Sequence, residues 1–384
     1  EAFAFVRIGS LEIPGGSFLY EDPSAKLRAA LPSWSLRING KREVFSHVLS
    51  LTTEAPGALV FQGRPIPIDL LRLSAEATAQ TAEVNDATVH SGASRLTASG
   101  KAEDLAAPRL SLSADGDIDL AEISGWVGVA EPLGGRLLLK ASASGPAGEP
   151  QIRARIEGSE LAFRDFRQVS LAAEAAWRAP GGAVAVESVN VRSPLGHLGG
   201  TAQLALFEEG GLSSVEAAIH RLDLERLSRT LKLPVVAAAG LRGTVEARWQ
   251  GMNLPSATAA ARLQLSPARP APSPNVLPVA GTLRAAGRLD GRVTVEIARL
   301  EALGSEWQGS IVLDALERLD GDLRVTVPRL DGFASSLDDF LGGERTLSDI
   351  GLGGSLGLSA QLGGTLAAPE AALEVETSGL RAGR

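Results

Sequence analysis

One short segment of the chain has the spacing of a serine hydrolase motif. Residues 353–357 (Gly-Gly-Ser-Leu-Gly) fit the Gly-x-Ser-x-Gly pattern, in which a sharp turn between a strand and a helix exposes the serine. That chemistry needs a histidine base later in the chain, and no histidine follows Ser355. Because Leu356, Leu358 and Ala360 alternate with polar or small residues, we expect a strand here and no nucleophile.

The histidines give no spacing that is typical of a metal site. His47, His90, His197 and His220 are far apart in the sequence, and none follows another at a ligand spacing such as i, i+4. The chain has no cysteine, which excludes thiolate ligands and a cysteine nucleophile. We therefore expect neither a metal ion nor a cofactor.

Two further clusters fit structural roles better than chemical ones. Asp338, Asp339 and Glu344 form a carboxylate cluster without a histidine nearby in the sequence, so we expect a solvated helix end. The glycine-rich residues 351–354 lack the Gly-Lys-Ser/Thr ending of a phosphate-binding loop, and we expect repeat turns there. No catalytic residue remains, and the chain is expected not to be an enzyme.

Composition narrows the possible partners. The formal net charge is −8 and the 37 Lys and Arg residues are scattered, which argues against a nucleic-acid surface. Aromatic residues make up only 4% of the 384 residues, so the apolar content comes mainly from Ala, Leu and Val. No apolar run reaches 18 residues. We expect a fragment of a longer chain, with any membrane anchor outside these residues.

The dominant pattern is an alternation of apolar and polar residues with period two. It predicts strands at residues 136–144, 151–157, 244–250, 292–298 and 323–327, bounded by Gly, Pro or Asp turns. Short helices are expected near residues 119–127, 223–233 and 331–341, with Asp223 as an N-cap. The proline-rich residues 267–278 are expected to form an extended loop between strands.

Several markers recur at intervals of about a hundred residues, which indicates an internal repeat. The pairs Asp119-Leu120 and Asp223-Leu224 are 104 residues apart. A second marker is a glycine that recurs at Gly92, Gly196 and Gly304, with intervals of 104 and 108 residues. A third marker is a glycine, a short spacer and a proline before an alternating strand. We expect one continuous domain, with repeat units at about 15–118, 119–222, 223–330 and 331–384 (partial).

A sheet with one apolar face must cover that face with a second sheet, with helices or with a ligand. Helices are too few, which leaves two alternatives: a closed sandwich core, or a trough open to apolar ligand. Burying an acyl chain of about sixteen methylenes gains on the order of 13 kcal/mol, so a trough would lower the barrier that water poses to lipid. Both alternatives remain open from the pattern alone.

The repeat resembles the TamB and AsmA-like proteins of the bacterial envelope. The resemblance rests on residues 135–157 (Gly-Arg-Leu-Leu-Leu-Lys onward), on 241–255 and 354–369 as further copies, and on the opening residues 7–22. It covers essentially the whole chain, but it rests on glycines and alternation instead of an invariant motif. We expect a fragment of such a protein, without the amino-terminal anchor and the TamB carboxy-terminal region.

The resemblance implies an all-β, antiparallel sheet curled into a long groove, called a β-taco. It also implies a periplasmic protein, anchored in the inner membrane, that conducts phospholipid acyl chains toward the outer membrane. The alternative is a scaffold for outer-membrane protein assembly and secretion, with a β-barrel partner of the BamA or TamA type. A closed structural spacer is a third hypothesis. Residues expected to line the groove are Leu137, Leu139, Ile152, Ile156, Val245, Trp249, Val293, Val295 and Ile297.

Overall fold

The structure of the chain is a computed structural model. It describes residues 9–22, 27–41, 46–61, 63–127, 133–178, 182–205, 211–233, 235–251, 253–269, 271–288, 290–315, 317–342, 347–365 and 368–383. The expected opening run at residues 2–8 and the carboxylate of Glu344 lie outside these ranges.

The chain is an all-β protein, as its alternation predicts. In the part of the chain that the structure describes, strands account for 74% and helices for 9%, and 23 strands pair into a curled antiparallel sheet that is not closed into a barrel there. Residues divide into two compact units, Glu1–Val189 and Asn190–Arg384, and the boundary lies within β13 (Val184–Ser193).

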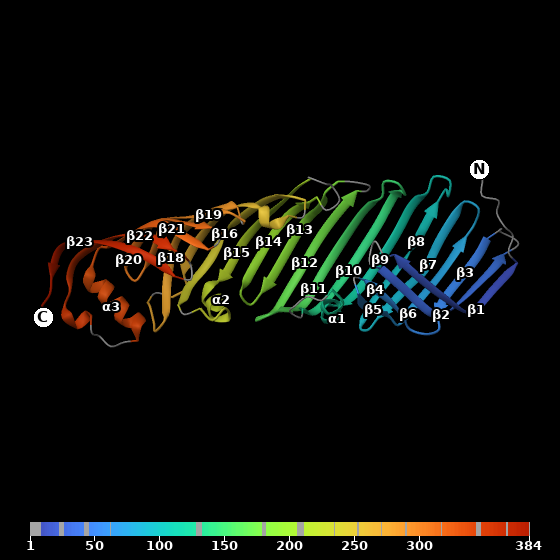
Figure 1. Cartoon of the computed structure of the whole chain (residues 1–384), viewed down its shortest axis with the longest axis horizontal. Coiled ribbons are helices and arrows are strands. Elements are labelled where there is room, and N and C mark those ends of the chain that lie inside the picture. Colours follow the sequence, from blue (N-terminus) through green and yellow to red (C-terminus); the bar gives the residue numbers. More distant parts are fainter. Residues whose placement is uncertain are drawn as a thin grey trace. The chain divides into compact units, whose positions relative to one another are not determined.

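In the first unit most strands pair with the strand that follows them in sequence, as Figure 1 shows for β7 to β12. The strands are β1 (Ser10–Asp22), β2 (Leu27–Lys41), β3 (Ser46–Thr53), β4 (Gly57–Phe61), β5 (Arg64–Ile68), β6 (Leu70–Ala77), β7 (Thr81–Ser91), β8 (Ser94–Glu103), β9 (Arg109–Asp119), β10 (Leu133–Pro146), β11 (Gln151–Phe163) and β12 (Phe166–Arg178).

An early branch interrupts this order. The first part of β2 pairs with β4, and its second part pairs with β3. Strand β4 then pairs with β5 in a short hairpin, whereas β3 pairs with β6.

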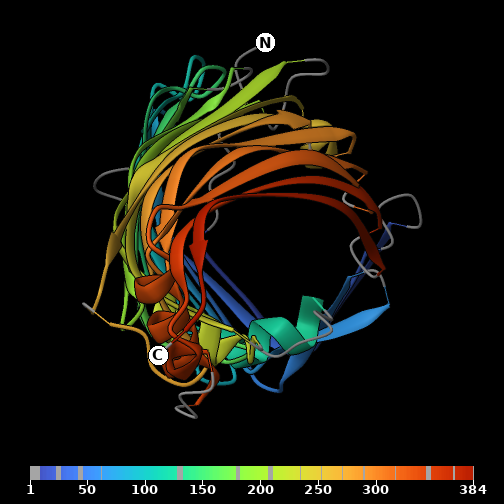
Figure 2. The same ribbon diagram turned by 90° about the vertical axis from the view of Figure 1, so that its left-hand side faces the viewer.

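In the second unit most strands also pair with the strand that follows them, and Figure 2 (yellow to red) shows that they curve into an arch. Its strands are β14 (Gly196–Leu204), β15 (Leu212–Asp223), β16 (Val236–Gln250), β17 (Thr258–Pro267), β18 (Val276–Arg288), β19 (Arg292–Ala302), β20 (Ser305–Asp314), β21 (Arg318–Val327), β22 (Gly353–Gly364) and β23 (Pro369–Arg381). Ser355 lies within β22, which confirms the expected strand there.

The three expected helices are confirmed as α1 (Leu120–Val127), α2 (Leu224–Thr230) and α3 (Leu330–Leu341). They follow β9, β15 and β21, so six strands separate each helix from the next. Asp119 and Asp223 cap the first two: Asp223 Oδ1 accepts from the Arg226 amide at 3.0 Å, and Asp119 Oδ1 from the Ala121 amide at 2.9 Å. Asp331 differs, because α3 begins one residue before it.

The proline-rich loop is shorter than expected. Strand β17 ends at Pro267 and β18 begins at Val276, so Pro278 lies inside a strand. There Val276–Pro278 pair in parallel with Val236–Ala238 of β16. A proline is tolerated near the start of a strand, where its missing amide hydrogen costs little. Pro270 lies outside the described residues.

One glycine shows how closely the strands approach. Gly309 of β20 has φ +148°, a conformation that side chains rarely adopt, and a Cβ there would collide with the carbonyl oxygen of Asp322 on β21. Gly309 faces Leu323 directly across the two strands. A larger residue would therefore both strain the backbone and separate the strands.

We expect Gly309→Ala to destabilise the second unit by about 1–3 kcal/mol, because alanine disfavours the positive φ of this position and its Cβ would collide with the backbone of β21. The matched control is Gly363→Ala in β22, where a Cβ would have open space and φ is not left-handed. Urea unfolding, followed by circular dichroism and by amide exchange on β20 and β21, measures the difference. Equal midpoints for the two variants would contradict this account.

Candidate functional site: an apolar face without a covering layer

Strand register joins the apolar residues of the second unit into rows that cross the strands. In one row, each residue lies directly opposite the next from β15 to β23: Ala217, Val245, Ala261, Ala285, Val295, Ile311, Gly321, Leu362 and Ala371. The neighbouring row is Ile219, Gly243, Leu263, Leu283, Ile297, Gly309, Leu323, Ala360 and Leu373. At about 4.8 Å per strand, each row extends roughly 38 Å.

The first unit contains the same arrangement. One row runs from β1 to β12 through Ile13, Leu36, Leu51, Leu73, Ala87, Ala98, Ala114, Ala141, Ala154 and Ala175. The row beside it includes Leu96, Gly116, Leu139, Ile156 and Ala173. The small residues keep the middle of this face shallow, while larger side chains lie on either side.

The opposite face of the sheet is charged. In the first unit Asp115, Lys140, Arg155 and Glu174 lie in one row across four strands. Arg155 donates to Glu174 at 3.4 Å and to Glu157 at 2.8 Å. These pairs are exposed and add little stability, but they keep this face wetted. The two faces therefore have opposite affinities for water.

Most of the apolar face is only half-buried. Among the residues that the structure describes in the first unit, no apolar side chain is fully buried, and serine and threonine are the buried side chains. Leu96 and Leu112 on this face are 42% and 37% exposed. Among the described residues of this unit, the apolar face is therefore not closed into a fully buried core.

The second unit covers its apolar face at one edge. There Leu224 of α2 packs with Ala239, Leu241, Leu265 and Val279. Phe333 of α3 packs on a separate cluster of Val325, Val327 and Leu330. The three helices all connect an odd-numbered strand to the next even one, so within each unit they lie at one edge of the antiparallel sheet. The Gly-to-Pro turns lie at the other edge.

Charged contacts hold α2 at this edge. Arg269, in the loop after β17, donates to both carboxylate oxygens of Glu225 at 2.6 and 2.7 Å, and Arg229 donates at 3.1 Å. Burial acts to raise the pKa of Glu225, but the hydrogen bonds from Arg229 and Arg269 outweigh it and keep the pKa below its ordinary value. The same loop reaches α3 through the Asn275 amide, which donates to the Phe340 carbonyl at 2.9 Å.

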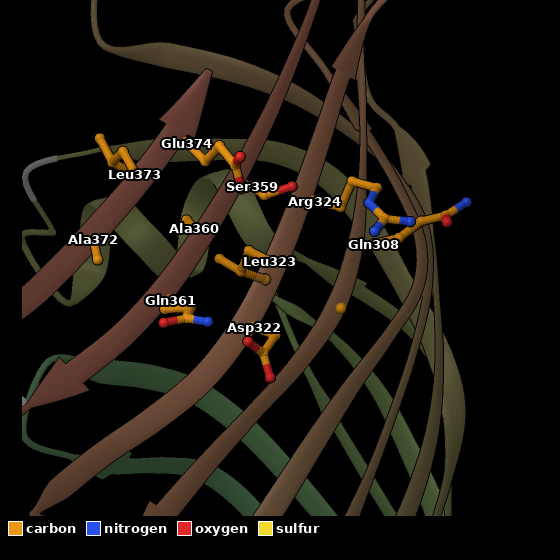
Figure 3. Close-up of a pocket in the computed structure, with 11 residues that line it drawn as sticks. Gln308, Asp322, Leu323, Arg324, Ser359, Ala360, Gln361, Ala372, Leu373 and Glu374 are labelled. Atoms are coloured by element: carbon orange, nitrogen blue, oxygen red, sulfur yellow. The ribbon is translucent and has the colours of Figure 1, made fainter. Parts of the chain in front are cut away.

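A hollow of about 640 Å³ lies over β20 to β23 (Figure 3). Its lining includes Gln308, Arg324 and Glu374 from the charged face, and Leu323 and Ala360 from the apolar rows. It has the size of a small-molecule pocket, but it is an open part of the sheet surface.

The residues expected to line a groove share the apolar face within each unit. Leu139 lies opposite Ile156, and Ile152 lies opposite Ala143 of the same face. Val245 and Val295 belong to one row, and Ile297 belongs to the next. Leu137, Trp249 and Val293 follow by strand alternation. Their role in binding lipid stays a prediction.

One expectation drawn from spacing is wrong. Asp338 is not part of a solvated helix end, because it is 2% exposed and accepts hydrogen bonds from the Ser348 amide and hydroxyl, each at 2.8 Å. The histidines are far apart in the sequence, but the fold brings the rings of His197 and His220 to 4.6 Å from each other. Spacing rules missed both, since each contact joins residues separated by a turn or a strand.

No protein-family model matches the chain, and no curated protein matches it. Within the described ranges, no helix is long and apolar enough to cross a bilayer. The same residues contain no group of three or more His, Asp or Glu side chains placed to hold a metal ion.

We expect Asp338→Ala to cost about 1–3 kcal/mol, because it leaves the amides of Leu347 and Ser348 without their acceptor. Asp339→Ala is the control, since Asp339 is exposed on the same helix. Thermal unfolding of both variants tests this, and similar losses for the two would mean that Asp338 does not hold α3 to the segment after it.

Proposed function

We propose that this chain conducts phospholipid passively along its apolar face, as a periplasmic segment of an envelope protein that bridges the inner and outer membranes. One observation supports the proposal: the apolar rows run across the strands, and among the described residues of the first unit no apolar side chain is fully buried. A closed core would bury its Leu and Val side chains. An acyl chain placed along a row would gain about 25 cal/mol for each Å² of apolar surface removed from water.

The resemblance to TamB and AsmA-like proteins supports the same function, including the inner-membrane anchor outside this chain. The mechanism needs no catalytic group, cofactor or metal ion. Lipid would move by exchanging similar apolar contacts along a row, with its headgroup in water. Because neighbouring positions in a row are chemically alike, no single position should trap the lipid.

Photo-crosslinking in cells tests the proposal. We expect a crosslinking residue at Val245, Val295 or Ile297 to capture phospholipid, because these positions lie on the apolar rows. Thr294 and Glu296 are the controls, since they flank Val295 on the same strand and belong to the opposite face. Capture at control and row positions alike, or capture at none, would contradict conduction along this face.

A charge on the same row gives a second test. We expect Val295→Lys to reduce lipid extraction from vesicles by the purified chain on the order of tenfold, since a lysine breaks the apolar path. Thr294→Lys should leave extraction close to that of the unaltered protein. Circular dichroism checks that both variants fold, and equal extraction by the two would count against the groove.

The alternative function is a scaffold for outer-membrane protein assembly, with a β-barrel of the BamA or TamA type as its partner. Such a scaffold would hold a client strand along an edge of the sheet. Capture of unfolded outer-membrane proteins along a strand edge, without lipid on the rows, would favour this function.

A further inference from the structure

A polar cluster on the charged face of the second unit has no part in lipid conduction. His197 of β14 and His220 of β15 lie on adjacent strands, with ring centroids 4.6 Å apart and ring planes inclined at 33°. His197 Nε2 is 3.5 Å from Oδ1 of Asn190, on β13. Three strands therefore bring two imidazoles and a carboxamide oxygen together.

Gly199 provides the space between these groups. A Cβ built on Gly199 would lie 3.1 Å from His220 Nε2 and 3.5 Å from Asn190 Oδ1. Because glycine has no side chain, the volume beside both of these atoms is not filled by Gly199. An irregularity in the β14–β15 register beside His197 brings the extra residue His220 into this position.

These distances suit a metal ion. Ligand atoms at about 2.0–2.2 Å from a tetrahedral zinc ion lie roughly 3.3–3.6 Å from one another, which matches the 3.5 Å between His197 Nε2 and Asn190 Oδ1. The two imidazoles suit Zn²⁺, Ni²⁺ and Cu²⁺ better than Ca²⁺ or Mg²⁺, which prefer a shell made of oxygen ligands.

We propose that His197, His220 and Asn190, arranged around Gly199, form a binding site for a late first-row transition-metal ion, with water completing the coordination. Such an ion would join β13, β14 and β15 where the ladder is irregular. The site lies on the charged face, so its occupancy is independent of lipid contact on the apolar rows.

Electrostatics set limits on this site. Burial lowers the pKa of His197, and the charges of His220 and Arg192 lower it further, which favours the neutral imidazole that binds metal. Arg192 also repels a cation, so binding should be weaker than at a closed four-ligand zinc site. The loss of any one of the three ligand side chains should therefore weaken the binding of the metal ion.

Isothermal titration of the full chain with Zn²⁺ tests the proposal. We expect one ion per chain, and a dissociation constant raised at least about tenfold by His197→Ala or His220→Ala. Gly199→Ala should have the same effect while leaving both imidazoles in place, because its Cβ would occupy the space for the ion. Its backbone is not left-handed, so alanine adds no strain there.

His90→Ala, in β7 of the first unit, is the control and should bind Zn²⁺ as the unaltered protein does. Thermal unfolding with and without Zn²⁺ checks that each variant is folded, and only proteins with the intact site should gain stability from the ion. Absence of zinc binding by the unaltered chain, or binding that persists unchanged in Gly199→Ala, would overturn the proposal.

Discussion

The structure depends on the pairing of apolar residues directly across antiparallel strands. Because side chains alternate between faces, each inward residue meets an inward residue on the next strand, and the pairs extend into rows such as Val245, Ala261 and Ala285. A shift of one residue between two strands would move their apolar side chains to the charged face. The register is therefore held strongly wherever the two faces differ, and the rows persist over many strands.

Apolar side chains at the ends of the strands would contact water unless another element covered them. In the second unit α2 and α3 pack over these side chains at one edge of the sheet, and buried clusters form there. The contact of Arg269 with Glu225 and the buried carboxylate of Asp338 fix these helices. Elsewhere the charged face keeps the sheet in water, while the apolar face is left accessible.

The candidate functions use different parts of this design. Lipid conduction needs the face, and the chemical sameness of neighbouring row positions favours sliding over tight binding. Strand addition needs an edge of the sheet whose backbone groups can pair with a client strand. The metal site needs neither, because its ligands lie on the charged face at an irregular part of the β14–β15 ladder. A single sheet can thus carry separable roles on its two faces and its edge.

The sequence by itself determined the strands, the three helices and which residues share a face, because these follow from local periodicity, as in residues 151–157 and at the Asp223 cap. Tertiary structure alone decided where the apolar face is covered, since alternation along a strand does not say which helices pack against a sheet. It also decided the contacts of Asp338 with Ser348 and of His197 with His220. Those contacts depend on how turns and register bring distant residues together, and spacing along the chain does not encode them.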